Sequence, residues 1–586
     1  MSVYRAPVEE MLFVMNEIGS LNEIATLPGY EEATPDLVAA ILEEAGKLGS
    51  DVLDPINITG DQQGCTLENG VVRTPDGFKE AYQQFIDAGW NSMPFDPEYG
   101  GQGLPWLIST GASEIWHAAN MSFGLCPMLT GGAAELLSIH GSDALKKIYL
   151  EKMISGKWTG TMNLTEPQAG SDLARVRTKA ERDGNHYRIS GQKIFITYGE
   201  HDFTENIIHL VLARTPDAPE GIKGISLFVV PKFLVNADGT PGDRNDLRCG
   251  SIEHKLGINA SPTAVMLFGE NEGAVGYLIG EENRGIEYMF TMMNNARLAV
   301  GLEGVAIAER AYQRARAFAE ERTQGRDSAS TSKEPVAIIQ HPDVRRMLLS
   351  MRTQTEAVRV LAYWVASRLD IAHRHPDPAV AKKAQSFVDL LTPVVKAWST
   401  DTGVEVANTG VQVHGGMGFI EETGAAQHLR DARIAPIYEG TNGIQAIDLA
   451  GRKIAREGGE TMGALIAEMR SSVAAMGTPH GRLSKAIDSL ELATDWIVEN
   501  FAENPVTALA GAVPYLRLTG IVVSGWLMVR TLEATKRDAD QFPLFARRRQ
   551  ASVSFYARHF LVQAPGLADT VLHGSSVIAD TAPELV

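Results

Sequence analysis

The chain has 586 residues, an apolar fraction of 44% and a formal net charge of −19 at pH 7. This length predicts three or four domains at about 100–200 residues each. The excess of acidic residues argues against sequence-independent attachment to nucleic acid or to an anionic membrane surface, but it does not identify a substrate.

Cysteine usage and the two ends of the chain favour a reduced, cytoplasmic protein without a metal site. The three cysteines are far apart, odd in number and without metal-site spacing. The start, MSVYRAPVEEML, lacks the basic stretch and apolar core of a secretory signal. The longest apolar run near the end, residues 520–529, is too short to cross a bilayer. We therefore expect no membrane partner.

The first part of the chain is helical in pattern. Residues 1–35 form an N-terminal extension, and residues 36–158 are expected to form a helical domain. TPDLVAAILEEAGKLGSDVL places apolar residues at helical spacing behind a Thr-Pro start. GFKEAYQQFIDAGW and DALKKIYLEKMISG show the same spacing, and a Gly/Pro-rich loop at 94–105 lies between them.

Residues 159–280 change to short runs rich in β-branched and aromatic residues. Examples are HYRISGQKIFIT, NIIHLVLART, GISLFVVPKFLV and SPTAVMLFG. Turn signals such as Asp-Gly and Pro-Asp separate these runs. The pattern predicts an antiparallel, β-barrel-like middle domain.

Helical spacing returns over residues 281–455, which we expect to form a helical bundle. The exposed linker GRDSASTSKEP (325–335) interrupts it. Residues 456–586 are again mostly helical and are expected to form an appended C-terminal domain. The predicted fold class is therefore α+β, in the order helical, β, helical, helical.

Two stretches of the predicted β domain have residues that suit a heteroaromatic cofactor. In MNLTEPQAGSD (162–172), Thr165 offers a hydroxyl and a backbone amide, and the small-residue turn exposes amides to an anion or a flat ring. In QKIFITYG (192–199), alternation places Phe195 and Thr197 on one face of a strand. Taken alone, each stretch is better explained as an ordinary polar loop or half-buried strand.

The stretches in the helical bundle also have plain structural explanations. The Gly-Gly pair in VQVHGGMGF (411–419) permits close approach to a phosphate, or simply ends a helix, and it is not a G-x-G-x-x-G fingerprint. His414 has no other ligand at metal spacing, so we expect a structural role. Arg297 can meet an acyl or phosphate oxygen. The basic residues at the end of EERTQGR (320–326) can be explained by their favourable interaction with the helix dipole alone.

One carboxylate in the stretch IAPIYEGTNGIQ (434–445) stands out. Glu439 lies between apolar residues and a Gly-rich turn. A buried charge without a partner is costly, so such a group tends to shift its pKa or to be used in chemistry. An exposed turn is the alternative explanation.

In order and spacing, these pieces resemble the acyl-CoA dehydrogenase family over about residues 36–455. The shared features are the LTEPQAGSD element, the KIFIT strand, an Arg on the helix after the β domain, a Gln-x-x-Gly-Gly turn and a Tyr-Glu-Gly-Thr segment. The C-terminal block, the insertion at 325–335 and the N-terminal extension are similar to the larger-subunit branch of that family.

The resemblance implies a FAD-dependent enzyme in which Glu439 is the catalytic base. This carboxylate would remove the α proton of an acyl-CoA thioester while a hydride leaves the β carbon for the flavin. Desolvation would raise its pKa toward the working pH and so strengthen it as a base. The backbone N–H of Glu439 would be one of the donors to the thioester oxygen.

The resemblance also implies the binding residues. Phe195 stands where many members carry Trp beside the flavin. Where members commonly have Arg-x-x-Phe-Gly at a helix end, this chain has Arg322 displaced by one residue and Gln324 in place of Phe. The implied FAD contacts are Leu164, Thr165, Ser171, Phe195, Thr197, Arg322, Gln324, Gln412, Gly415, Gly416 and Thr441. The implied substrate contacts are Ser171, Arg297, Tyr438 and Gly440.

The family builds each FAD site from two subunits, so the resemblance implies a homodimer, with an electron-transferring flavoprotein as electron acceptor. Overall similarity favours oxidation of 3-(methylthio)propanoyl-CoA to 3-(methylthio)acryloyl-CoA in dimethylsulfoniopropionate demethylation. The alternatives are a medium- or long-chain fatty acyl-CoA dehydrogenase and an oxidase. A nucleic-acid-associated flavoprotein would need a strongly basic C-terminal surface, whereas residues 451–586 hold one basic run, Arg547 to Arg549, among roughly balanced acids.

Overall fold

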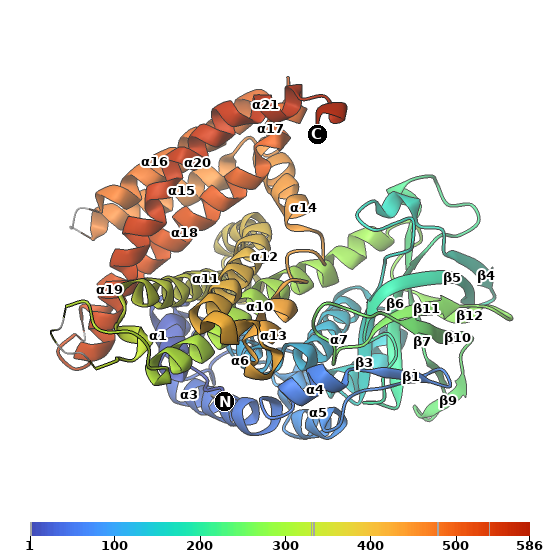
Figure 1. Cartoon of the computed structure of the whole chain (residues 1–586). Helices are drawn as coiled ribbons and strands as arrows, with labels where there is room; N and C mark the ends of the chain where they lie inside the picture. Colours follow the sequence, from blue (N-terminus) through green and yellow to red (C-terminus); the bar gives the residue numbers. More distant parts are fainter. Residues whose placement is uncertain (1–2, 330, 332–333, 477–479, 538) are drawn as a thin grey trace. The chain divides into compact units, whose positions relative to one another are not determined.

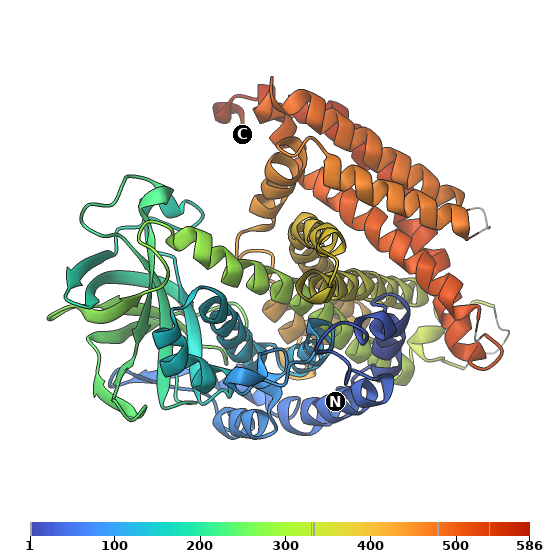
Figure 2. The same ribbon diagram turned by 180° about the vertical axis from the view of Figure 1, so that it is seen from behind.

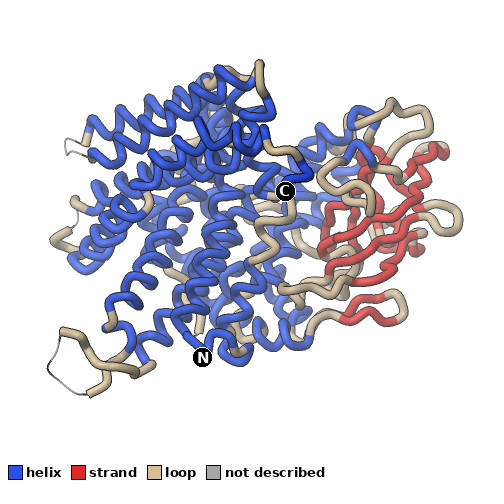
Figure 3. Tube along the Cα trace, turned by 45° about the horizontal axis from the view of Figure 1, so that its top comes forward, coloured by secondary structure: helices blue, strands red, loops and turns tan. Residues whose placement is uncertain are grey.

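A computed structural model describes residues 3–329, 331, 334–476, 480–537 and 539–586. The chain divides into two compact units. The sheet unit comprises residues 45–104 and 119–296, and the helical unit comprises residues 1–44, 105–118 and 297–586. All of the described strands belong to the sheet unit (Figure 3). This division differs from the five segments expected from the sequence, whose boundaries remain predictions.

The sheet unit contains an eight-stranded sheet in the order β10-β11-β5-β12-β7-β6-β3, with β4 paired to β5. Two-stranded ribbons, β1-β2 and β8-β9, complete its strands. The strands of this unit are β1 Thr66–Glu68, β2 Val71–Arg73, β3 Trp158–Asn163, β4 Lys179–Asp183, β5 His186–Thr197, β6 Asn206–Ala213, β7 Ser226–Pro231, β8 Phe233–Val235, β9 Pro241–Arg244, β10 Leu247–Ile252, β11 Thr263–Phe268 and β12 Ala274–Leu278.

The sheet is mixed, and the expectation of a wholly antiparallel domain was wrong in one pair. β3 runs parallel to β6, whereas the other pairs in the eight-stranded sheet are antiparallel. Parallel neighbours need a long crossover between them, and here the crossover is the 164–178 segment together with β4 and β5. Residue alternation does not reveal strand direction, so the sequence could not predict this pair.

β5 is the longest strand, and it changes partners along its length. Its first half pairs with β4 and β12, and its second half pairs with β11. Gly191 stands at this change with a φ of 153°. A Cβ there would lie 2.6 Å from Thr178 Oγ1, so only glycine fits without a clash.

Helices and buried apolar side chains cover this sheet. The helices that lie within the unit are α4 Asn57–Gln63, α5 Phe78–Asp87, α7 Met121–His140, α8 Asp143–Leu145 and α9 Glu151–Ile154. One apolar cluster joins α7 to β3, β6 and β7, and a second cluster lies among β5, β7, β10, β11 and β12. α7 packs directly on β3, the strand that leads into the LTEP segment.

The helical unit is built around three long helices, with further helices of the C-terminal region in orange and red (Figures 1 and 2). α10 begins in the sheet unit and continues into the helical unit. The helices are α1 Val8–Glu17, α2 Leu21–Ile24, α3 Pro35–Lys47, α6 Trp106–Ala119, α10 Gly285–Glu321, α11 Pro342–Arg374, α12 Pro378–His414, α13 Ala425–Ala432, α14 Asn442–Ile447, α15 Glu460–Ala475, α16 Gly481–Phe501, α17 Pro505–Ala510, α18 Ala512–Thr535, α19 Pro543–His559, α20 Ala564–Asp569 and α21 Ser575–Asp580.

Helices α10 and α12 approach each other closely because glycines line their contact. A Cβ on Gly304 would clash with the Ser399 carbonyl oxygen, and a Cβ on Gly403 would lie 2.8 Å from the Gly304 carbonyl oxygen. Both helices are buried along this contact. The close approach brings the polar side chains near it, on α10 and on α12, into the same region.

Within the described ranges, two helices, α7 and α18, are long and apolar enough by length and composition to cross a membrane. For α18 this differs from the sequence prediction, because the helix is longer than the ten-residue run 520–529. In the structure, 72% of the relevant window of α7 and 83% of that of α18 is buried inside the protein. Core helices of a soluble protein pass the same test, so this is weak evidence for a membrane span.

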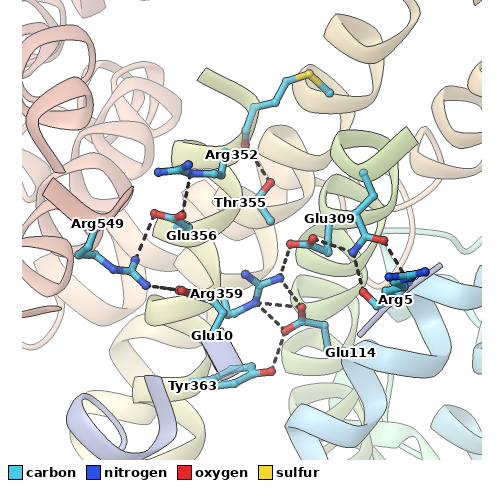
Figure 4. A network of polar contacts seen from close by, with 12 residues as sticks. Arg5, Glu10, Glu114, Glu309, Arg352, Thr355, Glu356, Arg359, Tyr363 and Arg549 are labelled. Atoms are coloured by element: carbon cyan, nitrogen blue, oxygen red, sulfur yellow. Dashed lines mark hydrogen bonds and ion pairs between the residues drawn. The ribbon is translucent and has the colours of Figure 1, made fainter. Parts of the chain in front are cut away.

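A buried ionic network joins five helices of the helical unit (Figure 4). Arg359 of α11 bonds to Glu114 of α6 at 2.9 and 2.7 Å, and to Glu309 of α10 at 2.7 Å. Arg549 of α19 pairs with Glu356 of α11 at 3.1 Å and with Glu10 of α1. The last two pairs connect the appended C-terminal region to the N-terminal extension and to the helical bundle. The predicted fold class, α+β with an extra C-terminal helical region, is confirmed.

Candidate active site

Glu439 lies in the turn between α13 and α14, in an unusual backbone conformation. Its φ is 55°, in the left-handed region, and that of Gly440 is 82°. A left-handed conformation is unfavourable for a residue with a Cβ, and such strain persists only where the surroundings hold it. Thr441 ends the turn by capping α14, since its Oγ1 accepts from the Ile444 N–H at 3.2 Å.

Side chains from two helices hold this turn in place. Lys396 of α12 donates from Nζ to the Gly440 carbonyl oxygen and to Asn442 Oδ1, each at 2.9 Å. Gln445 of α14 donates from Nε2 to the Glu439 carbonyl oxygen at 3.2 Å. The backbone around Glu439 is therefore fixed by hydrogen bonds from both sides, which accounts for the strained φ.

The pKa of the Glu439 carboxyl is raised toward neutral pH. Desolvation raises its pKa to about 7, and the nearby charges of Arg297 and Lys396 limit the rise. Burial lowers the pKa of Lys396 to about 8, against the opposing influence of Glu439 and Glu303. A carboxylate with a pKa near the working pH is a far stronger base than an ordinary exposed one and is still ionised often enough to act.

The backbone of the same residue offers a donor for an oxyanion. Within the described part of the chain, the Glu439 N–H donates no hydrogen bond. An N–H held in a rigid turn and left free can stabilise negative charge that develops on a bound carbonyl oxygen. Base and donor would then belong to one residue.

Five of the sequence-predicted residues come together in the helical unit: Tyr438, Glu439, Gly440 and Thr441 of the turn, and Arg297. Arg297 is buried on α10, 3.8 Å from Asp448, and its guanidinium lies beside Gly440. The Tyr438 hydroxyl donates to a carboxyl oxygen of Glu303, a fully buried residue of α10. The turn is thus flanked by fixed positive charge and by a second acid.

The other predicted residues of this unit lie at helix ends and are exposed. Gln412, Gly415 and Gly416 lie at the end of α12, where a Cβ on either glycine would meet open space. Arg322 and Gln324 follow the end of α10 and bond to each other at 3.4 Å. These positions leave room for a ligand.

His414 has a structural role, as expected. Its Nδ1 lies 2.7 Å from the Gly410 carbonyl oxygen and its ring stacks on Phe318 at 4.4 Å. Among the residues that the structure describes, no group of three or more His, Cys, Asp or Glu could hold a metal ion.

In the sheet unit, a buried ion pair fastens the LTEP segment to β5. Lys193 donates to Glu166 Oε1 at 2.8 Å and to the Leu164 carbonyl oxygen at 3.0 Å. Burial would raise the pKa of Glu166, but Lys193 and hydrogen bonds from Thr178 and Arg177 lower it to about 2. The Ile194 N–H also donates to the Thr165 carbonyl oxygen at 2.9 Å. Thr165 is therefore held beside the strand that carries Phe195 and Thr197.

Phe195 is displayed by a bulge in β5. The register with β11 shifts between Lys193 and Ile196, and Phe195 adopts a φ of 59°. Its side chain is 59% exposed, whereas the neighbouring Ile196 is buried. An aromatic ring held outward at a strained position is unusual and is consistent with a ring-binding surface.

The hydroxyls near this surface are free to meet a ligand. Among the described residues, the hydroxyls of Thr165, Thr197 and Ser171 form no hydrogen bond with the rest of the chain. Ser171 is exposed, and Leu164, Thr165 and Thr197 are half-buried. An outward aromatic ring on β5, with unpaired hydroxyls on the same strand and on the segment bonded to it, fits a flat heteroaromatic group such as a flavin.

Sequence reasoning missed four charged residues that organise the site: Glu166, Lys193, Glu303 and Lys396. Each of the last two is a single charge in an apolar helical run, in AVGLEGVAIA and LLTPVVKAWST. That pattern is a usable signal, because an isolated charge on a buried helix face needs a partner. Nothing in the sequence around them identifies Tyr438 or Gly440 as those partners.

Four family models match consecutive parts of the chain. They are the acyl-CoA dehydrogenase N-terminal domain over residues 69–157, the middle domain over 161–270, the C-terminal domain over 283–454, and an acetyl-CoA dehydrogenase C-terminal-like domain over 465–582. With the fold and the Glu439 turn described above, these matches define the class: the chain belongs to the acyl-CoA dehydrogenase family. It is an oxidoreductase, and FAD is the cofactor of this family.

Individual relatives extend the similarity to nearly the full length. The 3-methylmercaptopropionyl-CoA dehydrogenase of Ruegeria pomeroyi is 50% identical over 574 residues, which is 96% of each chain. A butyryl-CoA dehydrogenase of Syntrophomonas wolfei is 34% identical over 99% of this chain and 97% of its own. Among solved structures, ACDH-11 of Caenorhabditis elegans in complex with C11-CoA covers 99% of this chain and 96% of its own, with a TM-score of 0.77 at 20% identity.

Proposed function

We propose that this acyl-CoA dehydrogenase oxidises 3-(methylthio)propanoyl-CoA to 3-(methylthio)acryloyl-CoA, with Glu439 as the base, in the demethylation of dimethylsulfoniopropionate. The observation that supports this substrate most strongly is the 50% identity, over 96% of both chains, to the Ruegeria 3-methylmercaptopropionyl-CoA dehydrogenase. The observation that supports the base is the carboxylate held in a strained turn with a pKa raised to about 7.

In this proposal Glu439 takes the α proton of the thioester. Its backbone N–H donates to the thioester oxygen, on which negative charge develops as the proton leaves. Arg297 and Lys396 keep the turn electropositive, which favours the ionised base before the transfer. Bound FAD would supply the acceptor for the hydride of the β carbon.

The same proposal assigns the binding residues. Leu164, Thr165, Ser171, Phe195 and Thr197 of the sheet unit would hold the flavin. The helix-end residues Arg322, Gln324, Gln412, Gly415, Gly416 and Thr441 would serve the rest of FAD. Ser171, Arg297, Tyr438 and Gly440 would contact the substrate.

The two threonines give a first test of the flavin surface. Replacing Thr197 with Ala, or Thr165 with Val, should weaken FAD binding or perturb the flavin spectrum, since each change removes a hydrogen bond of about 0.5–1.5 kcal/mol. Affinity is measured by titrating apoprotein with FAD. Thr26→Ala is the matched control, because this exposed hydroxyl only bonds to the Glu23 carbonyl oxygen. Unchanged affinity and spectrum in both variants would contradict the assignment.

Substrate choice is tested by turnover across acyl-CoA chain lengths. Replacing a CH₂ by sulfur changes size and polarity little, and one methylene in an apolar pocket is worth only about 1–3 kcal/mol. We therefore expect butanoyl-CoA and pentanoyl-CoA to be oxidised as well as 3-(methylthio)propanoyl-CoA, and long chains to be poor substrates. If palmitoyl-CoA gave the highest kcat/KM, a long-chain fatty acyl-CoA dehydrogenase would replace this proposal.

The proposal includes a homodimer in the cytoplasm with an electron-transferring flavoprotein as electron acceptor. Family membership supports an acyl-CoA substrate and an acceptor of this type. Assaying turnover with an artificial acceptor and with oxygen separates a dehydrogenase from an oxidase. Light scattering of the holoenzyme gives the oligomeric state.

A further inference from the structure

A second acid lies buried directly behind the turn of the proposed base. Glu303 of α10 has no exposed surface. Its Oε2 accepts a hydrogen bond from the hydroxyl of Tyr438, the residue before Glu439. Its Oε1 is buried and has no hydrogen-bond partner among the described residues. Because an ionised carboxylate with one oxygen unpaired is costly to bury, this geometry favours the neutral acid.

The charges that act on Glu303 come from α12 and from the Glu439 turn, and further charges act on these neighbours. Lys396 on α12 and Glu439 in the turn act on it directly, and Tyr438 bonds to it. Asp401 acts on Lys396 from α12, and Asp448 and Arg452 act on Arg297 from the segment after α14. Desolvation, above all, raises the pKa of Glu303 to about 8; the Glu439 charge adds to the rise, whereas the Tyr438 hydrogen bond and Lys396 limit it. Burial outweighs the groups that favour the ionised form, so the neutral form of Glu303 is favoured near neutral pH.

We propose that Glu303 is a positioning residue for the base, acting as a neutral acceptor that fixes Tyr438 and, through it, the strained turn that aims Glu439. Lys396 holds the Gly440 side of the same turn. The glycine-lined contact of α10 with α12 places these two anchors on either side of Glu439. This proposal rests on the assignment of Glu439 as the base, which the Glu439→Gln variant tests separately.

The test compares Glu303→Gln with Glu303→Leu in the full-length, FAD-loaded enzyme with butanoyl-CoA as the probe substrate. Gln has nearly the same shape and keeps a group that bonds to Tyr438, so kcat should stay within about twofold of the parent. Leu removes the acceptor, so kcat should fall about five- to tenfold with KM unchanged. The kcat of Tyr438→Phe should fall by a similar factor. The double variant Glu303→Leu/Tyr438→Phe should have a kcat no lower than that of either single variant.

Glu309→Gln is the matched control, because Glu309 is also a buried acid of α10 but bonds to Arg359 and Gln313 instead. It should change thermal stability without changing kcat per bound FAD. Additive losses in the double variant, or a Glu303→Leu enzyme with unchanged kcat, would overturn the positioning role. An inactive Glu439→Gln with a fully active Glu303→Leu would refute this inference alone, whereas an active Glu439→Gln would refute the assignment of the base.

The neutral state of Glu303 has its own readouts. Since Gln replaces a neutral acid by a neutral amide, the pH at which kcat/KM rises should be the same in Glu303→Gln and in the parent. Glu303 keeps its proton in the folded protein and releases it at about pH 4.5 when unfolded, so its contribution to stability falls as pH rises from about 4.5 to about 8. The Tm of Glu303→Gln should therefore increase relative to that of the parent as pH rises over this range. A shift of the pH profile by about one unit, or a constant Tm difference, would overturn the neutral state.

Discussion

Replacing Glu439 with Gln should lower kcat by about 10²–10⁴-fold while the protein stays folded and FAD stays bound. The amide keeps the size of the side chain and can still accept a hydrogen bond, but it cannot take up a proton at working pH. The backbone N–H that would stabilise the thioester oxygen is unchanged, so substrate binding should largely persist. Single-turnover reduction of the flavin by butanoyl-CoA under anaerobic conditions measures the loss directly.

The pH dependence of the parent enzyme is part of the same prediction. A base must be ionised to act, so kcat/KM should rise as pH increases through about 7, the pKa of Glu439. Glu460→Gln, an exposed acid at the start of α15, is the control and should leave the rate unchanged. Near-parental turnover of purified Glu439→Gln would refute the assignment.

Removing residues 456–586 should cause aggregation or loss of the proposed homodimer rather than loss of chemistry as such. The deleted α18 is buried along most of its length, and its Trp526 ring packs on Trp364 of α11 with centroids 5.6 Å apart. Trp398 of α12 packs against Gly520 of α18. Exposing each large apolar side chain to water costs about 1.5–3 kcal/mol. The uncovered face would therefore promote aggregation.

The truncation also breaks the ionic network, because Arg549 is deleted while Glu10 and Glu356 remain. Glu356 keeps its pair with Arg352 at 3.0 Å, whereas the half-buried Glu10 loses its cation, and an acid left without its partner is destabilising. Solubility and particle size by light scattering are the measurements. Deleting only residues 581–586, which are mostly exposed, is the matched control and should change neither. A soluble, dimeric and active protein ending at residue 455 would show that the block is dispensable.

The sequence predicted the fold well where local pattern decides it. Alternating residues in KIFIT and helical spacing in the later segments led to the correct α+β class, and the order of the short motifs led to the family. Strand direction could not be predicted, since the parallel pairing of β3 with β6 depends on where the intervening strands lie in the sheet. The division into two compact units also depends on long-range contacts, which no local pattern contains.

The candidate site shows the same limit at the level of residues. Glu439 could be predicted because an acid in an apolar, Gly-rich stretch is unusual in itself. The residues that hold its turn could not be predicted, because Lys396 lies 43 positions earlier and Glu303 136 positions earlier in the chain. Only the packing of α10 on α12 brings them to the turn. The outward position of Phe195 likewise follows from a bulge opposite β11, which alternation within β5 does not reveal.

The left-handed backbone of Glu439 sets thermostability and turnover in opposition at this position. Glycine adopts a φ of 55° without penalty, so a library screened only for heat resistance would enrich Glu439→Gly and discard the base. Sequence optimisation that scores the backbone dihedral angles would make the same substitution. A stabilised version of this enzyme must therefore hold residue 439 fixed and find its gains elsewhere in the chain.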